Sequence, residues 1–325
     1  MKCGKNQKYF SIITSILLIS SIWVHSNTDY HIETSDIANF WHAFEMLNNV
    51  MTKQDSIDII QKQYLDKAST DFREFIKIRN FTAAEYVEKI GRYPLYWRSI
   101  KPRTENIEDQ LSELDNVVAK LEAAIPNYRQ PNICFAIGCL RTGGTTSENL
   151  VLIGAEIAAA DDSVEKSELP PWLRSIIGKT GGIISLVAHE IIHTQQIDRR
   201  IMNFGSNPLL EQTIKEGVAD FLTFEILGLN INQEIHNYGM LNECSLLKEF
   251  EADLKSEPKD YTNWLYNGGK MVDRPANLGY FIGFKIAESY YQKQTDKSEA
   301  IRQLLNQKEY SKIYKESAYL EKNCG

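Results

Sequence analysis

Two histidines lie four residues apart in the segment His189-Glu190-Ile191-Ile192-His193. At that spacing two imidazoles share one face of an α-helix and can bind one metal ion. The flanking residues are mostly apolar, which predicts a buried helix over about residues 182–196 and a dry wall around the imidazoles. Glu190 points about 100° around the helix from His189, so it faces the open position of the metal rather than joining its ligands.

A carboxylate can complete this metal site. Glu216 follows on a second predicted helix, residues 208–227, which can fold back antiparallel to the first. Two histidines and one glutamate leave the fourth tetrahedral position to water, as in a catalytic zinc site, so we expect one Zn²⁺ per chain. Asp220, one turn beyond Glu216, is expected to accept the second ring N–H of a histidine; the alternative is an acid on the helix surface.

The motif His189-Glu190-x-x-His193 with Glu216-x-x-x-Asp220 resembles the gluzincin, or thermolysin-like, metallopeptidases. More closely, residues 131–295 resemble the bacterial predicted zinc-dependent proteases related to gliding-motility lipoproteins. This resemblance rests on the run from Ile133 to Gly154 and on Asp273-Arg274-Pro275-x-x-x-Gly279-Tyr280-x-x-Gly283. It implies that His189, His193 and Glu216 are zinc ligands and that Glu190 is the general base. The sequence departs from a lipoprotein pattern because no cysteine directly follows its N-terminal apolar run.

Peptide hydrolysis also needs a donor for the oxyanion that develops on the substrate carbonyl. Tyr280 is the first candidate and Arg274 the second, because both lie in the motif-like stretch after the second metal helix. The aromatic neighbours of Tyr280 leave open that it is an ordinary core residue.

The surrounding pattern predicts a mostly helical α+β fold of zincin-like type. Residues 27–130 form a helical N-terminal region, in which Thr82 is a plausible N-cap, and residues 131–325 a catalytic domain. Two strands are expected near 131–140 and 149–155, joined by a hairpin-like turn at 141–146. The second strand is either the edge of the sheet, where it could bind an extended peptide, or an interior strand. Further helices are expected over 232–254, 278–294 and 297–305.

The chain begins with three lysines and an apolar run of 15 residues, which predicts a secretory signal peptide over residues 1–26. That run is too short to span a bilayer, so no transmembrane segment is expected in the mature chain; an uncleaved anchor is the alternative. We therefore expect an exported protein, located in the periplasm or cell envelope or secreted. Cys134, Cys139, Cys244 and Cys324 remain after cleavage and allow one or two disulfides, or none.

The net charge of −7 argues against binding to nucleic acid, since the sequence has no concentrated basic stripe. The sequence thus predicts an exported zinc-dependent peptidase acting on peptides or proteins. The alternative is a non-catalytic envelope protein that keeps the fold for binding or assembly. Glu190 favours the enzyme, because a carboxylate beside an apolar wall destabilises the fold and a scaffold has no use for it. A helical protein without metal would require both the histidine pair and Glu216 to be coincidences.

Overall fold

The computed structural model describes residues 30–179, 181–196, 207–256, 259–271 and 273–321. The predicted signal peptide lies outside these residues. In chain order the elements are β1 (Ile32–Glu33), α1 (Ser35–Met46), η1 (Leu47–Asn49), α2 (Lys53–Ile60), η2 (Gln61–Leu65), α3 (Thr70–Arg79), α4 (Ala83–Arg92), α5 (Pro94–Glu105), η3 (Ile107–Gln110), α6 (Leu114–Ala124), β2 (Asn132–Ala136), β3 (Gly144–Ser147), β4 (Leu150–Gly154), α7 (Ala155–Ala158), α8 (Pro171–Ile176), α9 (Ile183–Gln195), α10 (Pro208–Leu227), α11 (Gln233–Leu241), α12 (Glu243–Ser256), α13 (Gly279–Lys293), α14 (Lys297–Leu304), η4 (Gln307–Glu309) and α15 (Tyr310–Ser317). The fold is therefore mostly helical α+β, as the sequence predicts.

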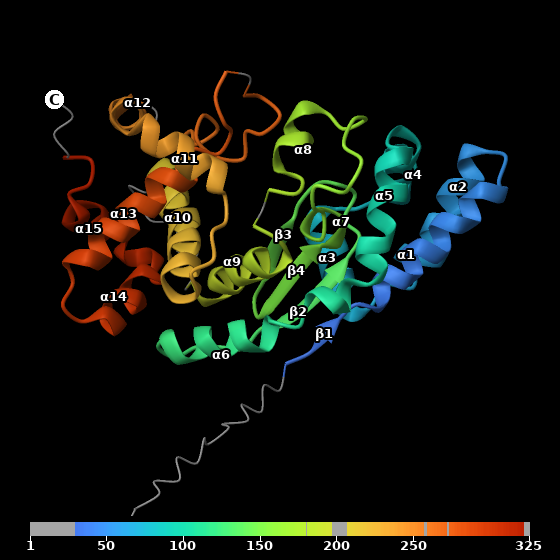
Figure 1. Cartoon of the computed structure of the whole chain (residues 1–325), viewed down its shortest axis with the longest axis horizontal. Coiled ribbons are helices and arrows are strands. Elements are labelled where there is room, and N and C mark those ends of the chain that lie inside the picture. The colour runs from blue at the N-terminus through green and yellow to red at the C-terminus, as the bar shows by residue number, and fades with distance from the viewer. Residues whose placement is uncertain (1–29, 180, 197–206, 257–258, 272, 322–325) are drawn as a thin grey trace, which may run out of the picture.

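The sheet has four strands in the order β1-β2-β4-β3. β1 and β4 run parallel to β2, whereas β3 runs antiparallel to β4. β4 is thus the interior strand of the two alternatives, and β3 is the edge strand on its side. Figure 1 shows the sheet between helices α1–α5 and the C-terminal helices, with α9 beside β3 and β4.

The expected hairpin at residues 141–146 is wrong. β2 and β4 are parallel neighbours, so a tight turn cannot join them. The segment instead contains β3, and the chain reverses after Ser147, where Glu148 has a left-handed φ of 41°. The sequence does not predict β3, because its residues Gly-Thr-Thr-Ser do not alternate between apolar and polar side chains. All four residues are only half-buried.

The N-terminal helices pack directly on the sheet. α1 contacts β2, and α3 contacts both β2 and β4. α3 ends at Asn80, whose left-handed φ of 51° stops the helix, and the Thr82 side chain caps α4 as expected by accepting from Glu85 N–H. One continuous apolar core includes side chains from these helices, the sheet and the C-terminal helices. The division predicted at residue 130 stays a prediction.

Two glycines set the distance between α10 and α13. A Cβ on Gly217 would lie 2.0 Å from the carbonyl carbon of Gly283, and one on Gly283 would lie 1.9 Å from the oxygen of Thr213. Only hydrogen fits at this crossing, so the two helix backbones meet.

The segment predicted as one helix over 232–254 is two, α11 and α12, which meet at Asn242.

The cysteines divide into two kinds. Cys134 and Cys139 are buried free thiols, so they do not bridge each other. Cys244 is disulfide-bonded, and Cys324 lies outside the described residues.

None of the helices within the described ranges is long and apolar enough to cross a bilayer.

Candidate metal centre

α9 presents the two histidines from a buried helix. Almost every one of its residues is buried, because apolar side chains surround the helix on all sides. Gly182 permits the left-handed turn, with φ of 88°, from which the helix starts. His189 and His193 lie one turn apart, and their Nε2 atoms approach to 3.0 Å.

α10 supplies the third ligand. The Asn207 side chain caps this helix by accepting from Leu210 N–H, and Gly228 ends it in the left-handed conformation. Oε2 of Glu216 lies 3.2 Å from Nε2 of His193 and 3.7 Å from Nε2 of His189. The structure therefore brings the three predicted ligands to one point, with their donor atoms within 4.8 Å of one another.

The spacing of these three atoms fits zinc. Zinc–nitrogen and zinc–oxygen bonds of about 2.0–2.2 Å in a tetrahedron place ligand atoms about 3.3–3.6 Å apart. The separations of 3.0, 3.2 and 3.7 Å lie around that value. Two imidazoles and a carboxylate are also a donor set that zinc favours.

Each imidazole has an oxygen close to the ring nitrogen that faces away from the cluster. Nδ1 of His189 lies 2.8 Å from Oδ1 of Asp220, where the sequence places this carboxylate. Nδ1 of His193 lies 2.8 Å from Oε1 of Gln196, whose amide group donates to Lys215 O. Because that donation fixes the amide, Oε1 faces the ring and accepts its Nδ1–H. The Nε2 lone pairs are left for a metal ion.

Two further side chains hold Asp220. Asn232 donates to its Oδ2 at 2.9 Å, and Nε2 of His236 lies 3.3 Å from the same oxygen. Asp220 is almost fully buried, at 1% exposure. Neither Asn232 nor His236 belongs to a recognisable motif, so the sequence alone does not assign them this role.

The charges of the cluster shift its pKa values strongly. Burial lowers the pKa of His189, but the Asp220 and Glu216 carboxylates outweigh it and raise the pKa to about 10. Burial raises the pKa of Glu216, yet the imidazoles of His193 and His189 hold it well below its usual range. The buried carboxylates of the cluster therefore favour a positive charge between them, and a divalent cation supplies such a charge.

Glu190 lies against the edge strand. A Cβ on Gly144 would lie 2.4 Å from Oε1 of Glu190, so the glutamate side chain rests on the bare backbone of β3. Burial raises the pKa of Glu190, while the positive charge of the histidines opposes that rise. A carboxylate with a raised pKa beside an exposed strand edge is suited to exchange protons near neutral pH.

Two tyrosines border the cluster. The Tyr280 ring stacks on His189, with 6.2 Å between ring centroids, so the structure brings this predicted residue to the site. Burial, followed by the charge of Glu216, raises the pKa of Tyr280 well above its usual value. Tyr266 was not anticipated from the sequence, although its hydroxyl donates to Oε1 of Glu216 at 2.6 Å. It is an exposed residue with a left-handed φ of 54°, and no motif marks it.

Arg274 lies elsewhere. Its guanidinium is paired with Glu249 at 2.7 Å and lies over the Trp264 ring, 5.2 Å from the centroid. Within the described residues it has no contact with the metal cluster. These contacts attach Arg274 to α12 and to the loop before α13.

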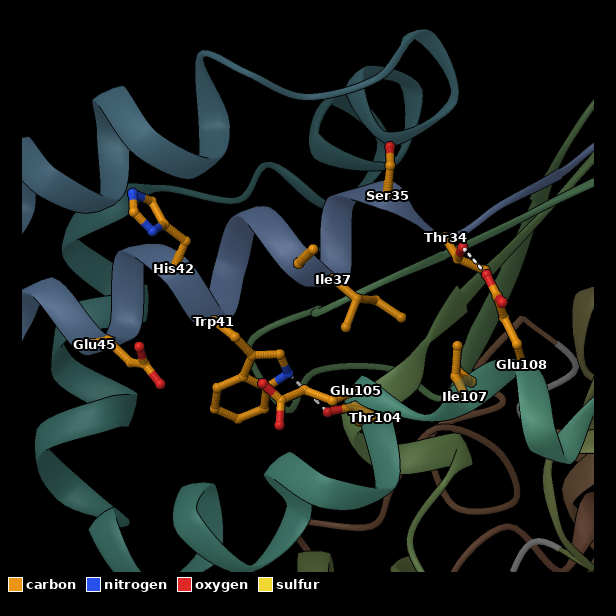
Figure 2. Close-up of a pocket in the computed structure, with 11 residues that line it drawn as sticks. Thr34, Ser35, Ile37, Trp41, His42, Glu45, Thr104, Glu105, Ile107 and Glu108 are labelled. Atoms are coloured by element: carbon orange, nitrogen blue, oxygen red, sulfur yellow. Dashed lines mark hydrogen bonds between the residues drawn. The ribbon is translucent and has the colours of Figure 1, made fainter.

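A separate pocket of about 590 Å³ lies between α1, the end of α5 and η3. Figure 2 shows Trp41 Nε1 donating to Thr104 and Thr34 donating to Glu108 across this pocket. None of its lining residues belongs to the metal cluster.

Residues 178–309 match a family model described as a predicted Zn-dependent protease (DUF2268). The matched segment contains His189, His193 and Glu216, so the cluster and the family description agree on zinc. No match was found among curated proteins or among solved structures.

Proposed function

We propose that this chain is an exported zinc-dependent peptidase of gluzincin type. The observation that carries the proposal is the convergence of His189, His193 and Glu216, with Glu190 held beside them on the edge strand. A site for structural zinc would be closed by a fourth protein ligand, whereas these three leave one position open. The family description supports a protease.

The residues of the chain divide the work of hydrolysis. Zinc, when bound, supplies a Lewis acid that makes water acidic near neutral pH and polarises a peptide carbonyl. The Glu190 carboxylate is placed to accept the proton of the attacking water and to pass it to the leaving amine. The Tyr266 and Tyr280 hydroxyls border the cluster, and either can stabilise the developing oxyanion once it turns from Glu216 to the substrate.

The edge strand β3 is suited to hold the substrate. Gly143 O accepts from Gly154 N–H of β4, so the backbone groups of the next residue, Gly144, point away from the sheet. Gly144 O accepts from the side chains of Arg79 and Thr142, so an extended peptide can pair with this edge only through Gly144 N–H and the outward-facing groups further along β3, which keeps its backbone next to Glu190. Such pairing binds main chain and gives little sequence preference by itself.

Export is supported by the predicted signal peptide and by the disulfide of Cys244, because disulfides persist in oxidising compartments. N-terminal sequencing of the protein recovered from the culture medium and the cell envelope tests export directly.

Metal analysis and hydrolysis together test the function. We expect about one zinc per chain in residues 27–325, its loss in Glu216→Ala, and its retention in Glu190→Gln and in the matched control Glu225→Ala, an exposed acid on the same helix. Casein hydrolysis should be abolished by Glu190→Gln and unchanged by Glu225→Ala. A wild-type chain that binds zinc but hydrolyses no protein or peptide would instead favour the non-catalytic envelope module.

A further inference from the structure

Arg79, the last residue of α3, has no ion-pair partner among the described residues, and the charge of Glu190 beside the metal cluster acts on it. Its Nη2 donates to Thr142 Oγ1 at 3.2 Å and to Gly144 O at 3.3 Å. Gly144 is the same residue whose bare backbone supports Glu190. Arg79 therefore lies at the strand edge where the substrate is expected to bind, although it is 65 residues away from Gly144 in the sequence.

The guanidinium keeps donors to spare. Nε is buried and has no hydrogen-bond partner among the residues that the structure describes. In the part of the chain that the structure describes, no acceptor is bonded to Nη1, and no carboxylate lies within 4.0 Å of the group. Nε has lost its water without gaining an acceptor, which is costly, whereas Nη1 is not among the buried unpaired atoms and is open to solvent or to a ligand.

The local charges partly offset the cost of burying Arg79. Burial lowers the pKa of Arg79, and the positive charge of Arg141 adds to that effect, while the negative charge of Glu190 opposes it. Arg141 differs because it has its own carboxylate, with Nη1 3.3 Å from Oε2 of Glu85. Two guanidinium groups thus lie near the edge strand of an acidic protein, and only Arg141 is neutralised by an ion pair among the described residues.

We propose that Arg79 binds a carboxylate group of the peptide substrate. This inference deepens the proposed peptidase function and rests on it. A planar guanidinium with free N–H groups matches a carboxylate in geometry and charge. The carboxylate is either the C-terminus of the peptide or an Asp or Glu side chain close to the cleaved bond. The first source makes the enzyme act near chain ends, and the second makes it prefer acidic sequences.

Binding, measured without turnover, tests the inference directly. The full chain in chelator is dialysed to equilibrium against a pool of acetylated hexapeptides, each made as the free acid and as the C-terminal amide, with matched Asp and Asn members. Mass spectrometry of the retained peptides gives the ratio within each pair. We expect the carboxylate member of one kind of pair to bind at least about tenfold more tightly. A C-terminal site discriminates acid from amide, and a side-chain site discriminates Asp from Asn.

Variants then assign the preference to Arg79. Arg79→Gln should abolish it, and Arg79→Lys should keep part of it, because charge remains without the planar fork. Arg141→Gln controls for a general loss of positive charge. This control should retain the preference, with melting curves confirming that all variants fold.

Two results would overturn the inference: equal retention of both members of every pair by the wild-type chain, or a preference that survives Arg79→Gln. The first needs no variant, so a folding failure cannot obscure it. The peptidase proposal fails separately, when zinc-loaded protein hydrolyses no peptide although the metal-free chain discriminates carboxylates through Arg79. Hydrolysis without any carboxylate preference, in contrast, removes only the role of Arg79.

Discussion

Nδ1 of His189 lies 2.8 Å from Oδ1 of Asp220, and both groups are buried. This contact orients the imidazole and increases its basicity, as carboxylates behind zinc-binding histidines do elsewhere. We expect Asp220→Asn to weaken zinc affinity by about 10–100-fold while the fold stays intact. Competition with a fluorescent zinc chelator measures the change. Glu225→Ala, in the same helix, serves as the control, and unchanged affinity in Asp220→Asn would show that the carboxylate does not support the metal.

Zinc affinity should depend steeply on pH. The carboxylates of Asp220 and Glu216 outweigh burial and raise the pKa of His189 to about 10 in the metal-free chain, so this imidazole carries an extra proton at neutral pH. Zinc must displace that proton, and affinity should rise about tenfold per pH unit up to the pKa. Zinc titrations between about pH 6 and pH 9 in buffers of different ionisation enthalpy measure both the slope and the proton release. A flat profile would contradict the raised pKa.

Gly144→Ala should damage catalysis rather than metal binding. The added Cβ would lie 2.4 Å from Oε1 of Glu190, so the carboxylate or the edge strand must move. A displacement of about 1 Å at a catalytic group costs about 10²-fold in rate. Zinc content should remain at the wild-type level. Gly91→Ala on α4, where no atom lies within 4 Å, is the matched control and should leave the rate unchanged.

The crossing of α10 and α13 predicts a stability effect. Gly217→Ala directs a methyl group into the backbone of Gly283 and should lower the free energy of unfolding by about 1–3 kcal/mol or more. Because Glu216 adjoins this crossing, zinc affinity should fall as well. Gly91→Ala should instead stabilise by about 0.5–1 kcal/mol, since its site is open and helical. Denaturant titration of both variants provides the comparison.

A buried glutamate outside the site gives the stability of the fold its own pH dependence. Burial raises the pKa of Glu156 to about 7, although Gly138 N–H and Leu140 N–H donate to its carboxylate. The folded state therefore holds a proton that the unfolded state has lost above about pH 4.5. The free energy of unfolding should fall by a few kcal/mol as the pH rises from about 4.5 to 7, and this contribution should level off above 7.

Urea titrations of the metal-free chain across this range measure the contribution of Glu156. Metal-free protein is required because zinc binding changes stability with pH on its own. Glu156→Gln should flatten the profile between these pH values. A wild-type profile that rises with pH through this window, and rises equally in the variant, would show that Glu156 is ionised throughout.

The sequence predicted the elements that carry the strongest local signals. The helix at 208–227 has the bounds of α10 because Asn207 caps its start and Gly228 ends it. The three zinc ligands can be predicted from the sequence, because helical periodicity alone places His189 beside His193. The third ligand, Glu216, requires only that the next helix packs against the first. The pairing of the strands cannot be predicted from the sequence, because β1 pairs with β2 across about a hundred residues and β3 has no alternation of apolar and polar residues.

The sequence alone does not predict residues that reach the metal cluster without belonging to a motif. Arg79 and Tyr266 belong to no motif, and they reach the site only through the tertiary positions of α3 and of the loop before α13. Tyr280, the first candidate, is found through its motif, but the same motif also offers Arg274 as the second candidate, which the structure pairs with Glu249. A shared motif indicates a shared neighbourhood in the chain and does not distinguish the side chain that faces the site.

The placement of β3 affects how this protein can be divided. A fragment that starts at residue 178 would contain all three zinc ligands and all of the segment matched by the family model. It would lack Gly144 on the edge strand and Arg79 on α3, so Glu190 would lose the backbone against which it rests. Such a fragment would also lose the sheet and α6, which pack on α9 within the same apolar core, so the helix that carries both histidines would lose its support. Under the proposed function, the smallest active unit therefore extends upstream to the N-terminal helices.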